Sequence, residues 1–156
     1  MKKYWLVKSE PDVYPLAQLK QDKSTGWTGV RNYQARNFMR DSMRIGDGVL
    51  FYHSNAEPKA IAGIAKVSSA PMPDPTQFDP ASEFHDPKSK PGNPPWIMIE
   101  IQFEKEFAHP LTLEELKRTP GLEKMMLTQR GSRLSVQPVT EAEWGIVLRL
   151  AGTMRR

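Results

Sequence analysis

The sequence predicts an α+β domain in which a curled sheet or open barrel of about five strands carries three or four helices. Three observations predict this class. Residues 96–107 contain an alternating pattern expected of a half-buried strand, with Ile97, Ile99, Ile101 and Phe103 on one face and Met98, Glu100, Gln102 and Glu104 on the other. Several shorter runs are rich in the β-branched and aromatic residues that favour strands. Two later stretches place Glu three residues after Thr, the pattern of a helix capping box.

Strands are predicted wherever a short apolar run ends at turn-forming residues. These runs are 3–8, 49–53, 61–67, the alternating 96–107 and, late in the chain, 133–139, which is interpreted as a short strand and turn. Gly63 interrupts the third run. A glycine inside a strand indicates a bulge or the close approach of another backbone, so one of these is expected at Gly63.

Helices are predicted at three places. In residues 33–43, apolar or small side chains recur at helical spacing with arginines beside them. The capping boxes mark two further helix starts, Thr112 with Glu115 and Thr140 with Glu143. The last helix has an apolar stripe with the spacing i, i+3, i+4 and i+7, formed by Trp144, Val147, Leu148 and Ala151.

Residues 71–95 differ in composition from the rest of the chain. They contain eight of its 14 prolines, so regular structure is nearly excluded there. Phe78 and Phe84 are the side chains expected to hold this segment against the domain. We therefore predict a single domain over residues 1–152 with a Pro-rich loop at 71–95, followed by a short tail at 153–156.

Composition limits the class of function. The 156 residues include no cysteine, which excludes disulfides and thiolate chemistry. No apolar run approaches the length that spans a bilayer, and residues 1–8 lack the pattern of a secretory signal. We therefore expect a cytoplasmic protein that does not engage a membrane. The net charge of +4 is compatible with a polyanionic partner and equally with an ordinary solubilising surface.

The motifs of common enzymes are missing. The chain has no Gly-rich phosphate loop and no GxSxG turn, and His53, His85 and His109 are not at metal-ligand spacing. Its paired carboxylates lie in predicted first turns of helices, where capping and the helix dipole account for them. We expect no cofactor, no metal and no catalytic activity.

Three segments, 4–11, 27–37 and 51–55, place polar side chains among aromatic ones. A nucleobase needs this combination, an aromatic face for stacking and hydrogen-bonding groups at its edge, and stacking contributes about 1–3 kcal/mol per base. Each segment also has a structural interpretation, namely Trp5 as core, Asn32 as a helix N-cap and His53 as a satisfied buried histidine. Periodicity does not show whether the segments meet in space.

Taken in order, these residues resemble the EVE domain family. The resemblance rests on 4–11, 29–37, 51–55 and 133–139, with Asp-Pro pieces in the Pro-rich loop, and covers about residues 3–150. It implies a PUA-like fold, a curled, mostly antiparallel β-barrel of five or six strands with three to five short helices around it. It also implies a non-enzymatic module that recognises a modified nucleobase, such as 5-methylcytosine or 5-hydroxymethylcytosine, in DNA or RNA. Nucleic acid is thus the expected partner, and the oligomeric state stays open, with a monomer favoured.

The resemblance also implies where the base is bound. Trp27 would be the stacking wall of the pocket, and Arg36 and Arg40 are expected to contact phosphates. The other expected pocket residues are Lys8, Ser9, Val30, Arg31, Asn32, Tyr33, Asn37, His53, Ser54, Asn55, Ser135 and Gln137.

Three alternatives remain open at this stage. A PUA-type RNA-binding module would use the same fold and would prefer RNA through its 2′-hydroxyl. A small PUA-like hydrolase would act on a nucleoside or an amide. A pocket for a free small molecule would bind without a salt dependence, because no phosphates would be neutralised.

Overall fold

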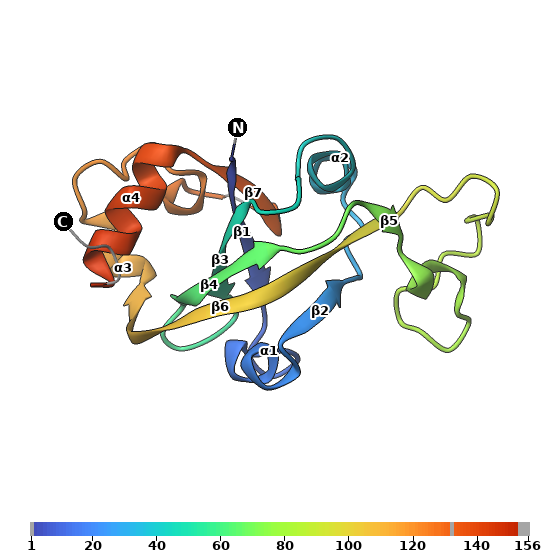
Figure 1. Cartoon of the computed structure of the whole chain (residues 1–156), viewed down its shortest axis with the longest axis horizontal. Helices are drawn as coiled ribbons and strands as arrows, with labels where there is room; N and C mark the ends of the chain where they lie inside the picture. The colour runs from blue at the N-terminus through green and yellow to red at the C-terminus, as the bar shows by residue number, and fades with distance from the viewer. Residues whose placement is uncertain (1, 132, 153–156) are drawn as a thin grey trace.

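Seven strands form one hydrogen-bonded sheet in the computed structural model (Figure 1), which describes residues 2–131 and 133–152. The strands are β1 (Tyr4–Ser9), β2 (Ser24–Trp27), β3 (Gly48–His53), β4 (Ala60–Val67), β5 (Met72–Pro73), β6 (Ile97–Thr112) and β7 (Val136–Val139). All five predicted strands are therefore confirmed, and β2 and β5 are additional. The tail predicted at 153–156 lies outside the described residues.

Four α-helices and two short 3-10 helices accompany the sheet in the described part of the chain. They are α1 (Leu16–Asp22), α2 (Tyr33–Asp41), α3 (Leu113–Lys117), α4 (Glu141–Leu150), η1 (Pro75–Phe78) and η2 (Met126–Thr128). Both capping boxes are formed, at the starts of α3 and α4, so the two helix starts are confirmed. The helix predicted at 33–43 is α2, which ends two residues earlier, and α1 is additional.

The sheet is mostly antiparallel and open. Its order is β2-β6-β4-β3-β1-β7, with β5 paired to β6 beside this path. β1 and β3 run parallel, with Ser9 opposite His53 at their ends, and the other neighbours are antiparallel. Among the described residues the path ends at β2 on one edge and at β7 on the other, and these four-residue strands do not pair. The predicted barrel is therefore not confirmed, although the α+β class is.

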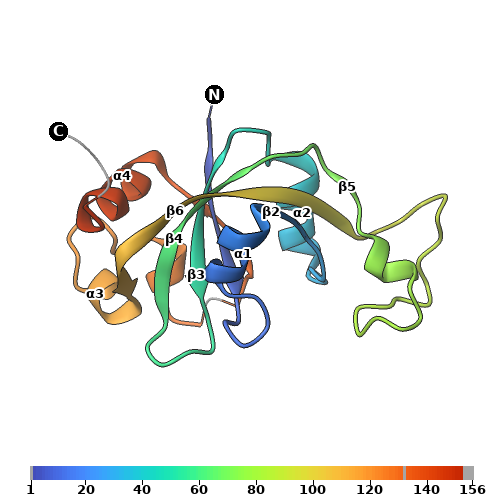
Figure 2. The ribbon, with the colours of Figure 1, turned by 60° about the horizontal axis from the view of Figure 1, so that its bottom comes forward.

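The sheet is nevertheless strongly curled (Figure 2). Trp27 on β2 and Phe51 on β3 are three strand positions apart, a span of about 14 Å in a flat sheet. Their ring centroids are only 5.6 Å apart. Register shifts on both sides of β4 supply the bending. One lies at Gly63, where a Cβ would be 2.3 Å from the carbonyl oxygen of Lys105, so the predicted bulge and close approach are both confirmed.

Each face of the curled sheet has its own core, because successive residues of a strand point to opposite faces. Trp5 and Val7 of β1 join a cluster with α1 and α2, whereas Leu6 between them joins a cluster with α3 and α4. The interpretation of Trp5 as a core residue is thus confirmed. Helices α3 and α4 lie at one end of the molecule and the Pro-rich loop projects at the other (Figure 1). No helix within residues 2–131 and 133–152 is both long and apolar enough to cross a membrane.

The Pro-rich loop is ordered by a buried glutamine in addition to aromatic contacts. The side chain of Gln77 is fully buried and its amide nitrogen donates to the carbonyl oxygens of Asp74 and Trp96, at 2.7 and 2.8 Å. Its amide oxygen accepts from the Ser89 hydroxyl and from the Trp96 amide. Four hydrogen bonds from one side chain therefore close this loop on itself at the start of β6.

Candidate functional site

A cavity of about 570 Å³ opens where β1 and β3 end, and we call it the Trp27 cavity. Because β1 and β3 are parallel neighbours, the polar residues that follow Ser9 and His53 emerge at the same edge of the sheet. The curl brings β2 and the residues after it against this edge, and the stretch before β7 completes the wall. The volume lies in the range of cavities that hold small organic groups.

Eight of the thirteen expected pocket residues line the Trp27 cavity. They are Lys8, Ser9, Trp27, Val30, Arg31, Asn32, Ser54 and Ser135. Nine lining residues were not anticipated: Glu10, Val13, Tyr14, Thr25, Gly26, Thr28, Gly29, Phe84 and Arg133. Several of these lie inside the segments that carry the family resemblance. Phe84 was expected only to hold the Pro-rich loop, and it does so while also forming part of the cavity wall.

Trp27 forms a partly buried aromatic wall of the cavity. Its indole lies nearly perpendicular to Phe51, at an interplanar angle of 78°, and to Tyr14, at 79° with the ring centroids 6.3 Å apart. Its backbone pairs with Ile99 of β6. These contacts fix the plane of the indole while part of its surface stays open to the cavity.

A buried carboxylate ties the segment after β2 to the Pro-rich loop. Oδ2 of Asp74 accepts from the amide of Gly29 at 2.8 Å and from Nη1 of Arg31 at 3.1 Å. Oδ1 accepts from the amide and the hydroxyl of Thr76 at 2.8 and 2.6 Å. Burial is the largest single influence on the pKa of Asp74 and would raise it, but these four donors together hold that pKa below its usual value. Asp74 is therefore an ionised structural anchor.

Arg31 uses every N–H of its guanidinium inside the protein. Besides Asp74, it donates to the carbonyl oxygen of Val30 at 3.0 Å, to the Thr76 hydroxyl at 3.0 Å and twice to the carbonyl oxygen of Phe84, at 2.7 and 3.2 Å. The guanidinium also lies 5.3 Å from the ring centroid of Trp96. Arg31 therefore shapes the cavity wall, and a polar contact from it to a ligand would have to displace one of these bonds.

The start of α2 supplies the rim of the cavity. Oδ1 of Asn32 accepts from the Ala35 amide at 3.0 Å, so the interpretation of Asn32 as an N-cap is confirmed, although its side chain also lines the cavity. Tyr33 lies outside the cavity, 58% exposed and stacked on Trp96 with centroids 4.7 Å apart. Asn37 is also outside, where it accepts from Nε of Arg36 at 2.9 Å.

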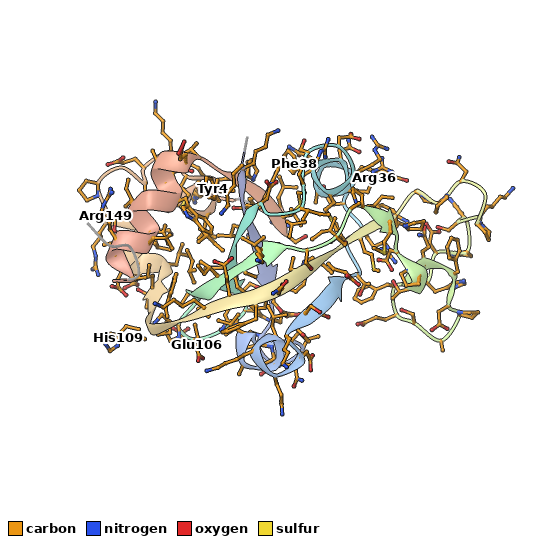
Figure 3. The ribbon with its side chains drawn as sticks, viewed as in Figure 1. Tyr4, Arg36, Phe38, Glu106, His109 and Arg149 are labelled. Atoms are coloured by element: carbon orange, nitrogen blue, oxygen red, sulfur yellow. The ribbon has the colours of Figure 1, made fainter. Side chains whose placement is uncertain are left out.

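The two arginines expected to contact phosphates have partners within the chain. Nη1 of Arg36 donates to the Pro95 carbonyl oxygen at 2.6 Å, and its guanidinium lies 4.9 Å from the Tyr33 ring. Figure 3 shows Arg36 on the side of α2 that faces β5 and the Pro-rich loop. Arg40 forms a two-point ion pair with Asp41 at 2.8 and 2.9 Å. Neither arginine lines the Trp27 cavity.

Three further expected pocket residues serve the fold instead of lining the cavity. Nε2 of His53 accepts from the Leu16 amide at 3.1 Å and so caps α1, whose N-cap residue Pro15 makes no side-chain cap. Burial lowers the pKa of His53, which keeps the imidazole neutral for this role. Gln137 is buried in β7 and donates to the Leu134 carbonyl oxygen at 2.9 Å. Asn55 donates to Oε1 of Glu10 at 2.7 Å.

The described residues contain no group of three His, Asp or Glu side chains that could hold a metal ion. His53 caps α1, and His109 projects from the exposed end of β6 near α3 (Figure 3). The Trp27 cavity therefore combines an aromatic wall with hydroxyl and amide groups, an arrangement suited to holding a planar polar molecule.

Comparison with known proteins identifies the family. The family model of the EVE domain matches residues 3–150 of this chain. The chain belongs to the EVE domain family. The family resemblance seen in the sequence is thereby confirmed.

This EVE domain has close relatives in animals and bacteria. Human thymocyte nuclear protein 1 is 39% identical over 165 residues, which cover 94% of this chain and 73% of the human protein. A crystal structure from Pseudomonas syringae has 46% identity and a TM-score of 0.91, covering 95% of this chain and 99% of that one. The structure of human THYN1 protein in complex with 5-methylcytosine containing DNA has 38% identity and a TM-score of 0.90, covering 99% and 100% of the two chains.

The network around Arg31 predicts a local effect of Arg31→Lys. The ammonium keeps the charge but cannot serve Asp74, Thr76 and the Phe84 carbonyl together. We expect the free energy of local opening at residues 74–89 to fall by about 2 kcal/mol, as unsatisfied buried groups cost about 1–3 kcal/mol. Hydrogen exchange followed by mass spectrometry measures this. Arg40→Lys, at an exposed ion pair, is the control and should change nothing. Unchanged exchange in Arg31→Lys would show that this network does not hold the loop.

The cap made by His53 predicts a pH dependence of stability. In the unfolded chain this histidine becomes protonated below about pH 6.5. In the folded protein the pKa of His53 is lowered by burial, so protonation requires a lower pH. The unfolded state therefore gains protons first as the pH falls, and the free energy of unfolding decreases, by at most about 1.4 kcal/mol per pH unit. Urea unfolding between pH 7 and pH 5 measures this slope. His53→Gln should reduce the slope and the exposed control His109→Gln should preserve it; equal slopes in both variants would refute the cap.

Proposed function

We propose that this EVE domain is a non-enzymatic module that binds a modified nucleobase, such as 5-methylcytosine or 5-hydroxymethylcytosine, in DNA or RNA. The observation that carries the proposal is the Trp27 cavity, in which one indole wall and several hydrogen-bonding side chains converge from four separate parts of the chain. The human relative whose structure contains 5-methylcytosine DNA supports the same ligand class.

The side chains around Trp27 match what a base requires. Stacking on the indole would contribute about 1–3 kcal/mol. The hydroxyls of Ser54 and Ser135 line the cavity, and neither makes a hydrogen bond to another described residue, so each can donate to or accept from the edge of a base. Nδ2 of Asn32 is a further donor, because only Oδ1 is used in capping α2. Val30 adds apolar surface, which suits a methyl substituent.

Two ionisable side chains near the Trp27 cavity, His53 and Asp74, are poorly placed to catalyse hydrolysis. A general base needs an accessible lone pair, but the accepting nitrogen of His53 is occupied by the Leu16 amide. The strongly hydrogen-bonded Asp74 is buried behind the cavity wall and held ionised by four donors. Neither group is placed to activate water against a bound base.

A binding panel with Trp27 variants tests the proposal. Short DNA and RNA strands would carry cytosine, 5-methylcytosine or 5-hydroxymethylcytosine, and fluorescence anisotropy at two salt concentrations would give each affinity. We expect tighter binding to one modified base than to cytosine. Trp27→Ala should weaken that binding by about 1–3 kcal/mol and Trp27→Phe should retain most of it, since one base–aromatic stack is worth this much.

Tyr33→Ala is the matched control, because Tyr33 is an exposed aromatic outside the cavity and its removal should leave affinity unchanged. Circular dichroism would verify that each variant is folded. Equal binding to all three cytosines would refute a modified-base reader, and full affinity in folded Trp27→Ala would refute stacking on this residue.

A further inference from the structure

A second cavity, of about 730 Å³, adjoins the Trp27 cavity, and we call it the basic cavity. It lies between the ends of β1 and β3 on one side and the segment from α3 to η2 on the other. Lys8 and Ser54 line both cavities. A linear ligand could therefore pass from one cavity to the other across these two residues.

The charge lining the basic cavity is unbalanced. Four cationic side chains face it, those of Lys8, Lys59, Lys117 and Arg130. Glu123 is the one carboxylate among its lining residues, and both of its oxygens accept from the Gly121 amide at 3.0 and 3.1 Å. Within the described part of the chain, the side chains of Lys59, Lys117 and Arg130 make no ion pair and no hydrogen bond. Arg31, Arg36 and Arg40 differ, since each has a partner.

Three of the neutral polar side chains that line the basic cavity, those of Thr128, Gln129 and Asn55, already have partners inside the protein. The Thr128 hydroxyl donates to the carbonyl oxygens of Leu122 and Met125, at 2.7 and 2.9 Å. The Gln129 side chain donates to the Glu123 carbonyl oxygen, and Asn55 donates to Glu10. Ordered protein groups thus frame the cavity, and Lys59, Lys117 and Arg130 face it without such partners among the described residues.

The cations also act on one another. Burial first, and then the like charge of Lys59, lower the pKa of Lys8. An anion bound near Lys8 and Lys59 would offset the repulsion between these two charges.

We propose that the basic cavity binds backbone phosphates of the nucleic-acid strand whose modified base occupies the Trp27 cavity. This inference rests on the function proposed above. Lys and Arg side chains are the usual phosphate contacts in nucleic-acid complexes, and they fix register without reading sequence. Lys8 and Ser54 would then lie between the stacked base and the flanking phosphates. Phosphate binding is assigned to Lys59, Lys117 and Arg130, because Arg36 and Arg40 each have a partner within the chain.

The test compares two triple variants that remove the same charge. The first carries Lys59→Gln, Lys117→Gln and Arg130→Gln. The control carries Lys3→Gln, Lys105→Gln and Arg149→Gln, at exposed positions that line neither cavity. The probes are a single-stranded nonamer with one central 5-methylcytosine, the free nucleoside 5-methyl-2′-deoxycytidine, and a nonamer of base-free deoxyribose phosphates. Affinities would be measured at several salt concentrations.

We expect the basic-cavity variant to bind the 5-methylcytosine nonamer at least tenfold more weakly at low salt. The slope of log affinity against log salt should flatten by about 2, because three phosphate contacts on a single strand contribute about 0.7 each. Its affinity for the free nucleoside should equal that of the wild type, and the control variant should keep the wild-type slope. The same loss in both triple variants would overturn the proposal, since the effect would then be one of net charge alone.

The base-free nonamer separates this inference from the proposed function. In one outcome, the basic-cavity variant loses binding to the base-free nonamer while the protein shows no preference for a modified base. That result would support the phosphate site and refute the base reader. If instead the protein prefers a modified base through Trp27 and the basic-cavity variant keeps the wild-type salt slope, the base reader would be supported and the phosphate site refuted. Inorganic phosphate at equal ionic strength is the remaining competitor. If inorganic phosphate displaces the 5-methylcytosine nonamer as effectively as the base-free nonamer does, the cavity binds free phosphate and the proposal of a strand-binding site is overturned.

Discussion

The ionised carboxylate of Asp74 is the interaction on which the Trp27 cavity depends. A charge buried in this way is tolerated only because hydrogen bonds and an ion pair replace its water. Here the replacing groups are the Gly29 amide, Thr76 and Arg31, which belong to two segments about 45 residues apart. The carboxylate thus links the segment after β2 to the Pro-rich loop. Arg31 adds a second link by donating to the carbonyl oxygen of Phe84. One wall of the cavity exists because this charge is satisfied.

The opposite wall follows from the register and curl of the sheet. Parallel pairing ends β1 and β3 side by side, and this places Lys8, Ser9 and Ser54 together although they are far apart in sequence. The curl then brings Trp27 within reach of Phe51 across two intervening strands. The shared edge also separates two kinds of surface, the aromatic Trp27 cavity on one side and the basic cavity with Lys59, Lys117 and Arg130 on the other.

Local patterns in the sequence were sufficient for most of the fold. The alternation in β6 and the capping boxes at Thr112 and Thr140 depend on neighbouring residues, and the structure contains all of them. Helix α1 was missed because its cap is His53, which is distant in sequence, and β2 was missed because four residues with a glycine show no period. Closure of a barrel depends on pairing between edge strands, which no local pattern reports.

The site was predictable where it coincides with family segments and not where side chains acquire distant partners. Arg36 is held by Pro95, and Tyr33 stacks on Trp96, contacts that appear only when the Pro-rich loop folds back. The partner of Arg40 is its neighbour Asp41 and could have been read from the sequence. No sequence motif contains the cations of the basic cavity. Lys59 lies before β4, Lys117 at the end of α3 and Arg130 after η2, so only the fold brings them together.

Stacking of a base on Trp27 is tested most directly by intermolecular nuclear Overhauser effects in the complex with a 5-methylcytosine oligonucleotide. The account predicts contacts from the indole protons of Trp27 to the methyl group and ring proton of the modified base. It predicts none from Trp144, which is buried in the core on the other face of the sheet. A bound oligonucleotide whose modified base contacts other aromatic side chains but not Trp27 would contradict it.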